Sequence, residues 1–361
     1  MTFSVKTKIY NTDDSLDIFE KLDYKKVFFI TDPFVVESRM IEKITQRLKK
    51  ESTYKIFDEI KPDPTIELVN SGIEKLLQED CDLVVAVGGG SAIDASKAIV
   101  YKAYEKTGDK KTFIAIPTTA GTGSEVTNFS IVTIGEKKEV LIDDLLLPDI
   151  AVLVPSFTKS VPNFITADTG MDVLTHAIES LVSKNADRFS KILSKEAIKL
   201  VFENLPIVYE DGLRMKSRKN MIEASTIAGI AFTNAGLGIN HSVAHILGGV
   251  FHISHGRLNA ILLPYIMKYN IEKSESARYE LRNIATELGL HDEYDFIKKI
   301  EELNRKFNIP KNLRGLNKID EREYFEKIDY MAEVAYNDRC TATNPGLVTI
   351  INLKNIFRDI F

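Results

Sequence analysis

The sequence predicts an α/β fold in the amino-terminal half of the chain and an all-helical fold in the carboxyl-terminal half. Up to about residue 155, short apolar runs rich in Val and Ile alternate with stretches of helical periodicity. After about residue 160, only helical periodicity remains. Two prolines interrupt the pattern in VPSFTKSVPNF, and 361 residues suit two domains. We therefore predict an α/β domain over residues 1–158 and a helical domain over residues 159–361.

The first half contains four runs that are short and apolar enough to be buried strands. They are KKVFFIT (25–31), DLVVAV (82–87), TFIAIP (112–117) and IAVLVP (150–155). SRMIEKITQRLKK (38–50) and TIELVNSGIEKLLQE (65–79) lie between them and have the periodicity of helices. Such alternation predicts a parallel sheet with helices on both faces. At the start, FSVKTKIY (3–10) alternates apolar and polar residues, which predicts an exposed edge strand and at least a homodimer.

The second half contains a series of predicted helices and no strand signal. They are ADTGMDVLTHAIESLVSK (167–184), SKILSKEAIKLVFENLP (190–206), KNMIEASTIAGIAFTNAG (219–236), ARYELRNIATELG (277–289) and DEYDFIKKIEELNRKF (292–307).

Composition excludes several classes of function. The net charge is −5 with both signs interspersed, and the basic cluster RMKSRKN (214–220) is short, so we expect no nucleic-acid partner. No apolar run approaches the ~20 residues of a membrane span, and the N-terminus lacks the apolar segment of a secretory signal. The two cysteines form no CxxC motif, which fits a reducing cytoplasm.

Two glycine-rich turns each follow a predicted strand directly. One begins at Gly88 in GGGSAIDASKAI, and the other is TTAGTGSEVT (118–127). Glycines let a backbone approach a ligand, and a following helix offers free N–H groups to a phosphate. Neither turn is a P-loop or a GxGxxG motif, and one such turn alone could be only a tight turn. Two turns at the ends of strands in one sheet face the same crevice, which favours a dinucleotide or other phosphate ligand.

Asp32 follows the first predicted strand in FFITDPF. An acid at this place can accept a hydrogen bond from a ribose 2′-OH. It precedes the glycine turns, whereas the ordinary dinucleotide motif has its acid ~20 residues after them. The alternative is an aspartate that only caps a turn or helix.

The histidines are few and clustered. Of six in the chain, four lie within residues 236–256, and a fifth, His176, follows Asp172 by four positions in a predicted helix. His241 and His245 have the same spacing, so each pair lies on one helical face.

Gly248 and Gly249 predict a helix end, after which His255 would lie in a loop. Three imidazoles and a carboxylate suit Fe²⁺, Zn²⁺ or Mn²⁺. Spacing alone leaves open which of four side chains bind the ion: His241, His245, His252 and His255.

These motifs together resemble the iron-containing alcohol dehydrogenase family over essentially the whole chain. The resemblance is carried by GGGSAIDASKAI, IPTTAGTGSEVT, TGMDVLTHAIE, GLGINHSVAHILGGVFHISHG followed by NAILLP, and DRCTATNP. Through PDPTI and TADTGMDVLTHA the chain is most similar to microcompartment-type 1-propanol dehydrogenases. Butanol dehydrogenases and the alcohol dehydrogenase half of bifunctional aldehyde/alcohol dehydrogenases are close rivals. The resemblance implies a Rossmann-like dinucleotide-binding domain and an all-α metal-binding domain, as in dehydroquinate synthase-like architectures.

The resemblance also implies roles for single residues. It places the metal ligands on Asp172, His176, His241 and His255, and makes His245 a catalytic residue beside the ion. It leaves His252 to packing or to polar contacts around the site. It places cofactor contacts on Asp32, Asp63, Gly89, Gly90, Ser91, Thr118, Thr119, Thr122, Ser124 and Lys138, with Lys137 as the alternative to Lys138. Val154 and Gly346 stand where the family commonly has an aspartate and an arginine.

The implied activity is the NAD(H)-linked interconversion of short-chain primary alcohols and aldehydes such as 1-propanol and propanal, with Fe²⁺, or Zn²⁺ in its place, as Lewis acid. NAD(H) is expected rather than NADP(H), in the cytoplasm or inside a bacterial microcompartment, with an aldehyde dehydrogenase as a candidate partner. One set of alternatives lies within the family: a butanol or diol dehydrogenase. The others are a metal-dependent lyase resembling dehydroquinate synthases, whose pocket needs more basic residues, and a non-catalytic metal-binding protein.

Overall fold

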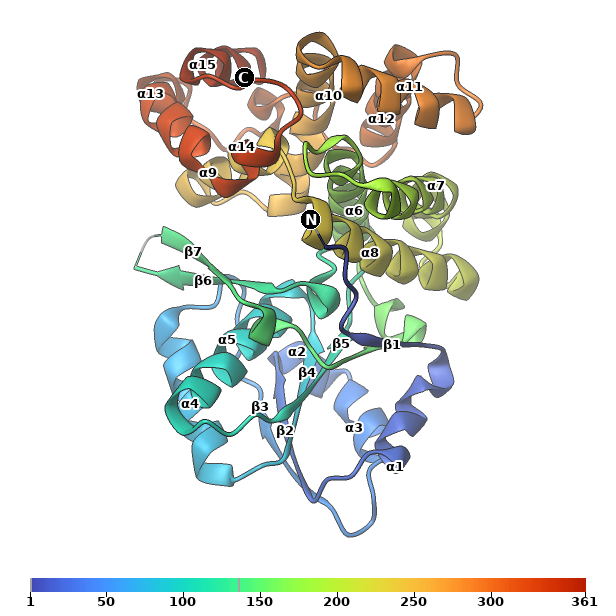
Figure 1. The fold of residues 1–361 in the computed structure, drawn as a ribbon, viewed down its shortest axis with the longest axis vertical. Coiled ribbons are helices and arrows are strands. Elements are labelled where there is room, and N and C mark those ends of the chain that lie inside the picture. Colours follow the sequence, from blue (N-terminus) through green and yellow to red (C-terminus); the bar gives the residue numbers. More distant parts are fainter. Residues whose placement is uncertain (1, 136) are drawn as a thin grey trace. The chain divides into compact units, whose positions relative to one another are not determined.

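The computed structural model describes residues 2–135 and 137–361, except for the side chains of Asp13, Lys137 and Lys138 (Figure 1). The chain folds into two compact units. The α/β unit comprises Ser4–Val161 and Leu213–Gly229, and the helical unit comprises the segment ending at Phe3, Pro162–Gly212 and Ile230–Phe361.

The α/β unit is built on a six-stranded sheet of order β1-β8-β5-β4-β2-β3, in which every pairing is parallel. The strands are β1 (Lys8–Asn11), β2 (Lys26–Thr31), β3 (Thr53–Phe57), β4 (Leu83–Gly88), β5 (Thr112–Pro117) and β8 (Ile150–Leu153). The four predicted buried strands are confirmed as β2, β4, β5 and β8. The sequence did not predict β3, because this edge strand has no apolar run and only its last residue is buried.

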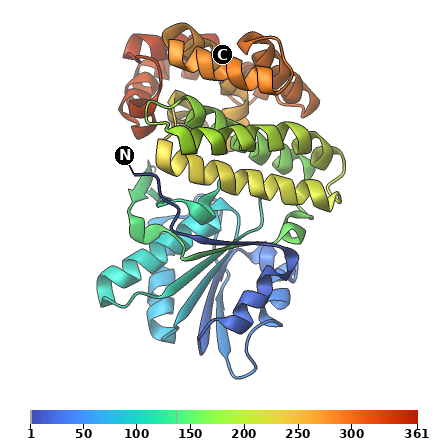
Figure 2. The same ribbon diagram turned by 45° about the vertical axis from the view of Figure 1, so that its right-hand side comes forward.

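Helices cover both faces of this sheet, as predicted (Figure 2). One face packs on α4 (Ile66–Glu79) and α5 (Gly90–Thr107). The other packs on α1 (Ile18–Lys21), α2 (Pro33–Glu37) and α3 (Met40–Thr45). Successive residues of a strand point to opposite faces, so Phe28 of β2 contributes to the first core and Phe29 to the second.

Two features lie at the margins of the α/β unit. An antiparallel hairpin is formed by β6 (Phe129–Ile134) and β7 (Lys137–Ile142). At the sheet edge, β1 pairs only with β8, so the predicted edge strand is present, although it begins at Lys8 rather than Phe3.

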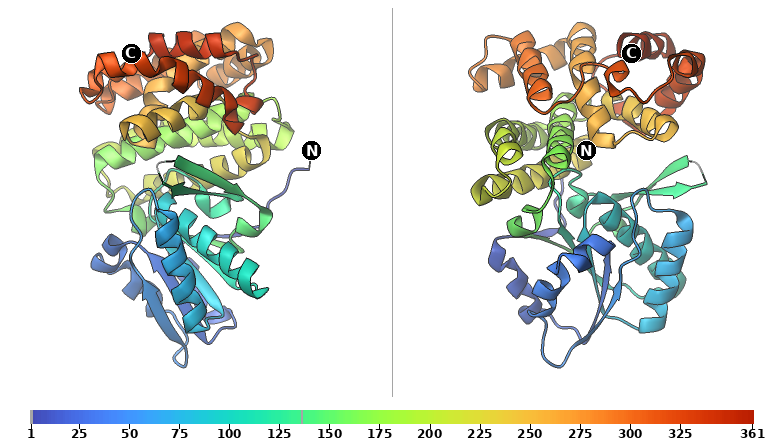
Figure 3. Two further views of the ribbon diagram at one scale, coloured as in Figure 1. Left: turned by 90° about the vertical axis from the view of Figure 1, so that its left-hand side faces the viewer. Right: turned by 180° about the vertical axis from the view of Figure 1, so that it is seen from behind.

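The helical unit contains helices and no strand within residues 162–212 and 230–361, which confirms the predicted all-α fold (Figure 3). Its helices are α6 (Asn163–Val182), α7 (Arg188–Glu210), α9 (Ile239–Phe251), α10 (His255–Lys273), α11 (Glu275–Glu287), α12 (Glu293–Lys306), α13 (Glu321–Asn337), α14 (Arg339–Thr343) and α15 (Ile350–Asp359). None of the described helices is both long and apolar enough to span a bilayer.

Helix α8 (Met215–Ala235) is divided between the units. The predicted boundary after residue 158 does not include this return of the chain to the α/β unit. The first part of α8 belongs to the α/β unit because its backbone lies close to the second glycine-rich turn. A Cβ on Gly123 of this turn would lie 2.8 Å from Cα of Gly229 in α8. The hydroxyl of Thr226 also donates a 2.6 Å hydrogen bond to the buried Glu125 carboxylate.

Two glycines bring helices of the helical unit close to α6. A Cβ on Gly170 would lie 2.3 Å from the Leu205 side chain of α7, and one on Gly256 of α10 would lie 2.3 Å from the carbonyl oxygen of Asp168. Larger residues at these positions would push α7 and α10 away from α6. The helix that carries two of the predicted metal ligands is therefore held tightly by its neighbours.

Candidate functional site

Helix α6 carries the first two predicted metal ligands. Asp172 and His176 are four residues apart, so they lie on one helical face, and both are buried. The His176 ring stacks between two others, 4.4 Å from Phe232 and 4.6 Å from His241 between ring centroids.

The other two predicted ligands come from α9 and α10. His241 lies in the first turn of α9, and His255 is the first residue of α10, so the prediction of a loop histidine was wrong. The predicted helix end at Gly248 was also wrong, because α9 continues to Phe251. His252 ends it in a left-handed conformation (φ 53°), with its N–H bonded to the Gly248 carbonyl and its side chain exposed. His252 is thus a C-cap residue, and its exposed side chain does not serve packing.

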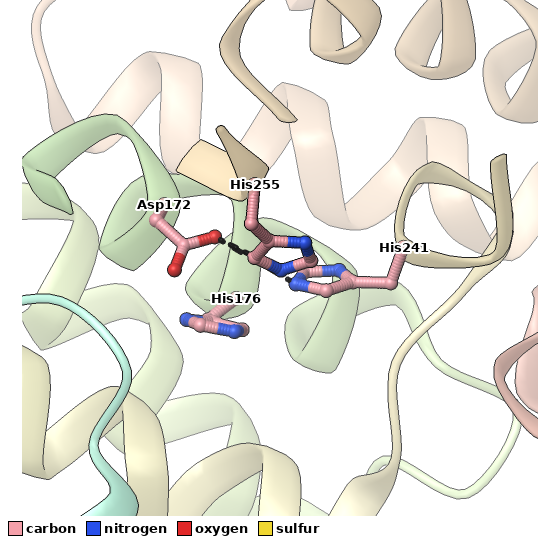
Figure 4. A group of neighbouring side chains, drawn as sticks. All are labelled: Asp172, His176, His241 and His255. Atoms are coloured by element: carbon pink, nitrogen blue, oxygen red, sulfur yellow. Dashed lines mark ion pairs between the residues drawn. The ribbon is translucent and has the colours of Figure 1, made fainter. Parts of the chain in front are cut away.

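The four side chains converge on one point (Figure 4). Ligand-type atoms from Asp172, His176, His241 and His255 all lie within 4.8 Å of one another. Oδ1 of Asp172 is 3.9 Å from Nε2 of His241 and 3.6 Å from Nε2 of His255. Burial and the neighbouring imidazoles lower the pKa of His241 well below its usual value, which favours the neutral ring that a metal requires.

Asn259 provides a test of whether this set fits a cation. Its amide nitrogen lies 2.6 Å from Oδ1 of Asp172, 3.2 Å from Nε2 of His241 and 3.0 Å from Nε2 of His255. An amide nitrogen has only two N–H groups, yet three potential acceptors surround it. The donor atoms therefore converge as they would on a cation, and three imidazoles with one carboxylate suit Fe²⁺ or Zn²⁺.

Sequence reasoning missed Glu179, which follows His176 by three residues on the same face of α6. Its Oε2 lies 2.5 Å from Nδ1 of His241. Burial raises the pKa of Glu179 to about 8, against the backbone N–H groups of Asn240, Gly238 and His241, which lower it. A carboxyl group three residues after a predicted ligand was the available signal for this contact.

His245 lies beside the four-residue set, with its ring centroid 5.4 Å from that of His255. Its Nδ1 is 2.9 Å from Oδ2 of Asp338, which caps α14 by accepting a hydrogen bond from the Cys340 N–H. Burial raises the pKa of Asp338, but the hydrogen bond and charge interaction with His245 outweigh this effect and hold it at about 2. No spacing pattern predicts this pair, since Asp338 lies 93 residues from His245 along the chain.

In the α/β unit, the two glycine-rich turns lie against each other. They follow the adjacent strands β4 and β5, and the Thr118 N–H donates to the Gly88 carbonyl at 3.0 Å. A Cβ on Gly90 would lie 2.6 Å from the Thr122 side chain, and one on Gly89 would lie 3.4 Å from Oγ1 of Thr119. The α5 helix begins at Gly90, so free N–H groups of its first turn lie at this edge.

Asp32 lies next to this edge. It follows β2, which neighbours β4, and a Cβ on Gly88 would lie 3.1 Å from its Oδ2. Along the chain, β2 is followed by β3 on one side and then by β4 on the other, so strand order reverses between β2 and β4. Ligands of open α/β sheets bind at such a switch point. Asp32 also caps α2 through the Val35 N–H at 3.1 Å, and burial raises its pKa.

The remaining predicted cofactor contacts differ in their surroundings. Asp63 is exposed in a left-handed conformation (φ 53°). Ser91 is half-buried in the first turn of α5. Ser124 is buried, and its hydroxyl donates a hydrogen bond to the carboxylate of Asp94, which stabilises the second glycine-rich turn. Lys138 pairs with Thr133 through the backbone, but its side chain, like that of Lys137, lies outside the described residues.

Comparisons with known families agree in both halves of the chain. Residues 7–155 match the family described as iron-containing alcohol dehydrogenase, and residues 166–361 match the carboxyl-terminal part of the Fe-containing alcohol dehydrogenase family.

Among individual proteins, the chain is similar to a 1-propanol dehydrogenase, PduQ, of Citrobacter freundii, at 38% identity over 99% of each chain. It is 37% identical to an NADPH-dependent butanol dehydrogenase of Clostridium saccharobutylicum over 100% of this chain and 98% of the relative. A solved structure of sulfoacetaldehyde reductase from Bifidobacterium kashiwanohense in complex with NAD⁺ is similar at a TM-score of 0.89 and 30% identity, covering 99% of this chain and 98% of the other.

Proposed function

The chain belongs to the iron-containing alcohol dehydrogenase family, and from that premise we propose that it interconverts short-chain primary alcohols and their aldehydes with NAD(H). It is a metal-dependent oxidoreductase. The observation that carries the proposal is the convergence of Asp172, His176, His241 and His255 within 4.8 Å. The name of the 1-propanol dehydrogenase relative supports a three-carbon substrate.

We assign the four converging side chains as the metal ligands. These residues would hold a divalent ion, which would supply Lewis-acid stabilisation of negative charge on the substrate oxygen. A catalytic site also needs a side that is open to the substrate, whereas a structural site is closed. His255 supports this view, because its side chain is 36% exposed whereas those of Asp172 and His241 are 5% and 2% exposed. The site is therefore more open on the side of His255.

His245 is the candidate for proton transfer. Its Nδ1 faces Asp338, which is an acceptor at neutral pH because its pKa is held at about 2. A neutral ring then carries its proton on Nδ1 and keeps the lone pair on Nε2. That nitrogen can take the alcohol proton during oxidation, directly or through water, and return it during reduction. Asp338 orients the base without exchanging the proton itself.

The switch point of the α/β sheet is the proposed NAD(H) site. A dinucleotide held there would supply the nicotinamide that donates or accepts the hydride. The glycine turns at Gly89, Gly90 and Thr118–Ser124 allow a pyrophosphate to approach the start of α5. Its location at this edge supports a role for Asp32 in accepting a hydrogen bond from the ribose 2′-OH and in repelling a 2′-phosphate. We assign minor contacts to Asp63, Ser91 and Lys138.

Three further proposals concern the setting of the enzyme. The free edge of β1 favours a homodimer. Cys81 and Cys340 are unpaired thiols, which suits a reducing cytoplasm or the interior of a bacterial microcompartment. An aldehyde dehydrogenase that makes or consumes the same aldehyde is the proposed partner.

The test is a turnover assay on anaerobically purified, iron-loaded protein with propanal and NADH. We expect NADH oxidation that is lost after chelation and restored by Fe²⁺. A panel from acetaldehyde to butanal, together with a diol-derived hydroxyaldehyde, separates propanol, butanol and diol dehydrogenase activity, and the butanol dehydrogenase relative makes butanal the main rival. Bound metal without turnover on any aldehyde would instead support the lyase or the non-catalytic metal protein.

A further inference from the structure

The Glu179 carboxylate lies between the start of α9 and the ring of His241. Oε1 accepts a hydrogen bond from the backbone N–H of Asn240 at 2.7 Å, and Oε2 lies 2.5 Å from Nδ1 of His241. Both side chains are 2% exposed, so water does not compete for these contacts. Nε2 of His241 faces the opposite way, toward Oδ1 of Asp172 at 3.9 Å. The two nitrogens of this ring therefore have different surroundings.

Gly238 makes this arrangement possible. A Cβ at this position would lie 2.7 Å from Oε1 of Glu179, so any other residue would displace the carboxylate from this position. Because Gly238 is the N-cap of α9, the carboxylate reaches the free N–H groups of the first turn, where a negative charge is favoured. Oε1 thus has a fixed role as acceptor, and Oε2 is left for the ring of His241.

We propose that Glu179 is a positioning residue that holds the proton of His241 on Nδ1, so that Nε2 keeps the lone pair a metal ion requires. The proposal rests on the proposed function, since it takes His241 to be a ligand. A neutral imidazole carries one N–H, and an ionised carboxylate can only accept it. Burial raises the pKa of Glu179, but a divalent cation on the other side of the His241 ring would favour its ionised form. Carboxylates in this position fix the tautomer and orientation of metal-bound histidines, and their loss typically lowers metal affinity about 10- to 100-fold.

Glu179→Gln is a sharp test because the Asn240 N–H orients the new amide. The amide oxygen must take the place of Oε1, since an NH₂ group there would face another donor. The NH₂ group then lies at Oε2 and donates to Nδ1 of His241, which moves the ring proton to Nε2. The variant changes almost no volume, yet it reverses the tautomer and blocks the ligand atom. We expect Zn²⁺ affinity of the metal-free protein to fall about 10- to 100-fold.

Glu293→Gln is the matched control. Glu293 is another fully buried glutamate of the helical unit, paired with Arg282 on α11. This variant also replaces a buried carboxylate by an amide, and it should leave Zn²⁺ affinity unchanged. A general loss of stability would affect both variants alike, whereas loss of ligand positioning affects only Glu179→Gln.

The tautomer is measured directly by nitrogen NMR of labelled histidine in metal-free protein. The measurement is made at a pH above the value of about 8 to which burial raises the pKa of Glu179, so that its side chain is a carboxylate. Wild-type protein should show His241 protonated on Nδ1, and this holds as a test even if Glu179→Gln does not fold. An Nε2-protonated His241 in wild-type protein, or unchanged Zn²⁺ affinity in Glu179→Gln, would overturn the proposal. Wild-type protein that binds no Zn²⁺ would overturn both proposals. Correct tautomer and tight Zn²⁺ binding without aldehyde turnover after iron loading would overturn only the proposed function.

Discussion

Oδ2 of Asp338, the N-cap residue of α14, lies 2.9 Å from Nδ1 of His245 in α9. Glu179 makes the same kind of contact with Nδ1 of His241. Two histidines one helical turn apart thus each have a carboxyl partner at Nδ1. What distinguishes them is the other nitrogen: Nε2 of His241 faces the Asp172 carboxylate, whereas His245 lies outside the four-residue cluster.

Asp338→Asn should lower stability at neutral pH but not in acid. The folded-state pKa of about 2 is below the ordinary value of 3.8, so the ionised carboxylate stabilises the fold above about pH 4, and this contribution is lost as pH falls through about 2. At one pKa unit per 1.36 kcal/mol, the contribution is about 2 kcal/mol. Asparagine keeps an oxygen for the Cys340 N–H, so the cap survives. Urea unfolding of both proteins at pH 7 and pH 3 should show a gap that narrows at the lower pH, and a constant gap would contradict the assignment.

Asp172→Asn should abolish metal binding while leaving the fold nearly intact. The change removes the only carboxylate of the set and replaces it by a neutral side chain of equal size. Metal content and aldehyde reduction should both be lost. NADH binding should remain, because the predicted cofactor residues belong to the α/β unit. Metal analysis together with NADH fluorescence titration checks this, and a variant with normal metal and turnover would remove Asp172 from the ligand set.

The sequence predicted the parts of the molecule in which local spacing carries the information. The four-residue spacing of Asp172 and His176 predicted that they share a helical face, and short apolar runs predicted the buried strands. The edge strand β3 has no such run, because four of its five residues are exposed. The end of α9 was misplaced because Gly248 and Gly249 are tolerated inside the helix, and the chain turns only at His252.

Contacts between residues far apart in the chain could not be predicted from residue spacing. Asn259 meets Asp172 across 87 residues, and Asp338 meets His245 across 93. These contacts depend on how the helices pack, which cannot be predicted from the residue spacing of a single sequence. Spacing likewise could not separate His241 from His245, since both lie on one face of α9, and only the family resemblance assigned them different roles.

Asp32→Ser should shift the cofactor preference toward NADPH. Serine keeps an oxygen that can cap α2 through the Val35 N–H, but it lacks the charge that would repel a 2′-phosphate. We expect kcat/KM with NADPH to rise relative to that with NADH. Steady-state kinetics with both cofactors measures the ratio. Equal efficiency with the two cofactors in the unmutated enzyme would contradict the role of Asp32.

The protein should be at least a homodimer that pairs through the β1 edge. Ile9→Lys places a charge at an exposed apolar position of this strand and should weaken the dimer. Tyr54→Lys is the control, because Tyr54 is an exposed apolar residue on β3 at the opposite edge of the sheet. Light scattering at micromolar concentration should show dissociation for the first variant only. Dissociation of the Tyr54→Lys variant alone would instead indicate an interface at β3. A monomeric wild-type protein would contradict the proposed homodimer.

His241→Ala and His245→Ala should separate metal binding from proton transfer. Loss of His241 leaves only Asp172, His176 and His255 around the site, so this variant should purify without metal. His245→Ala should retain metal and cofactor but turn over ~10²- to 10⁴-fold more slowly, the cost of losing general acid–base catalysis. Water can replace the missing base in part, which would reduce the loss in rate. Metal content measured side by side decides the matter: a metal-free His245→Ala beside a loaded His241→Ala would reverse the two roles.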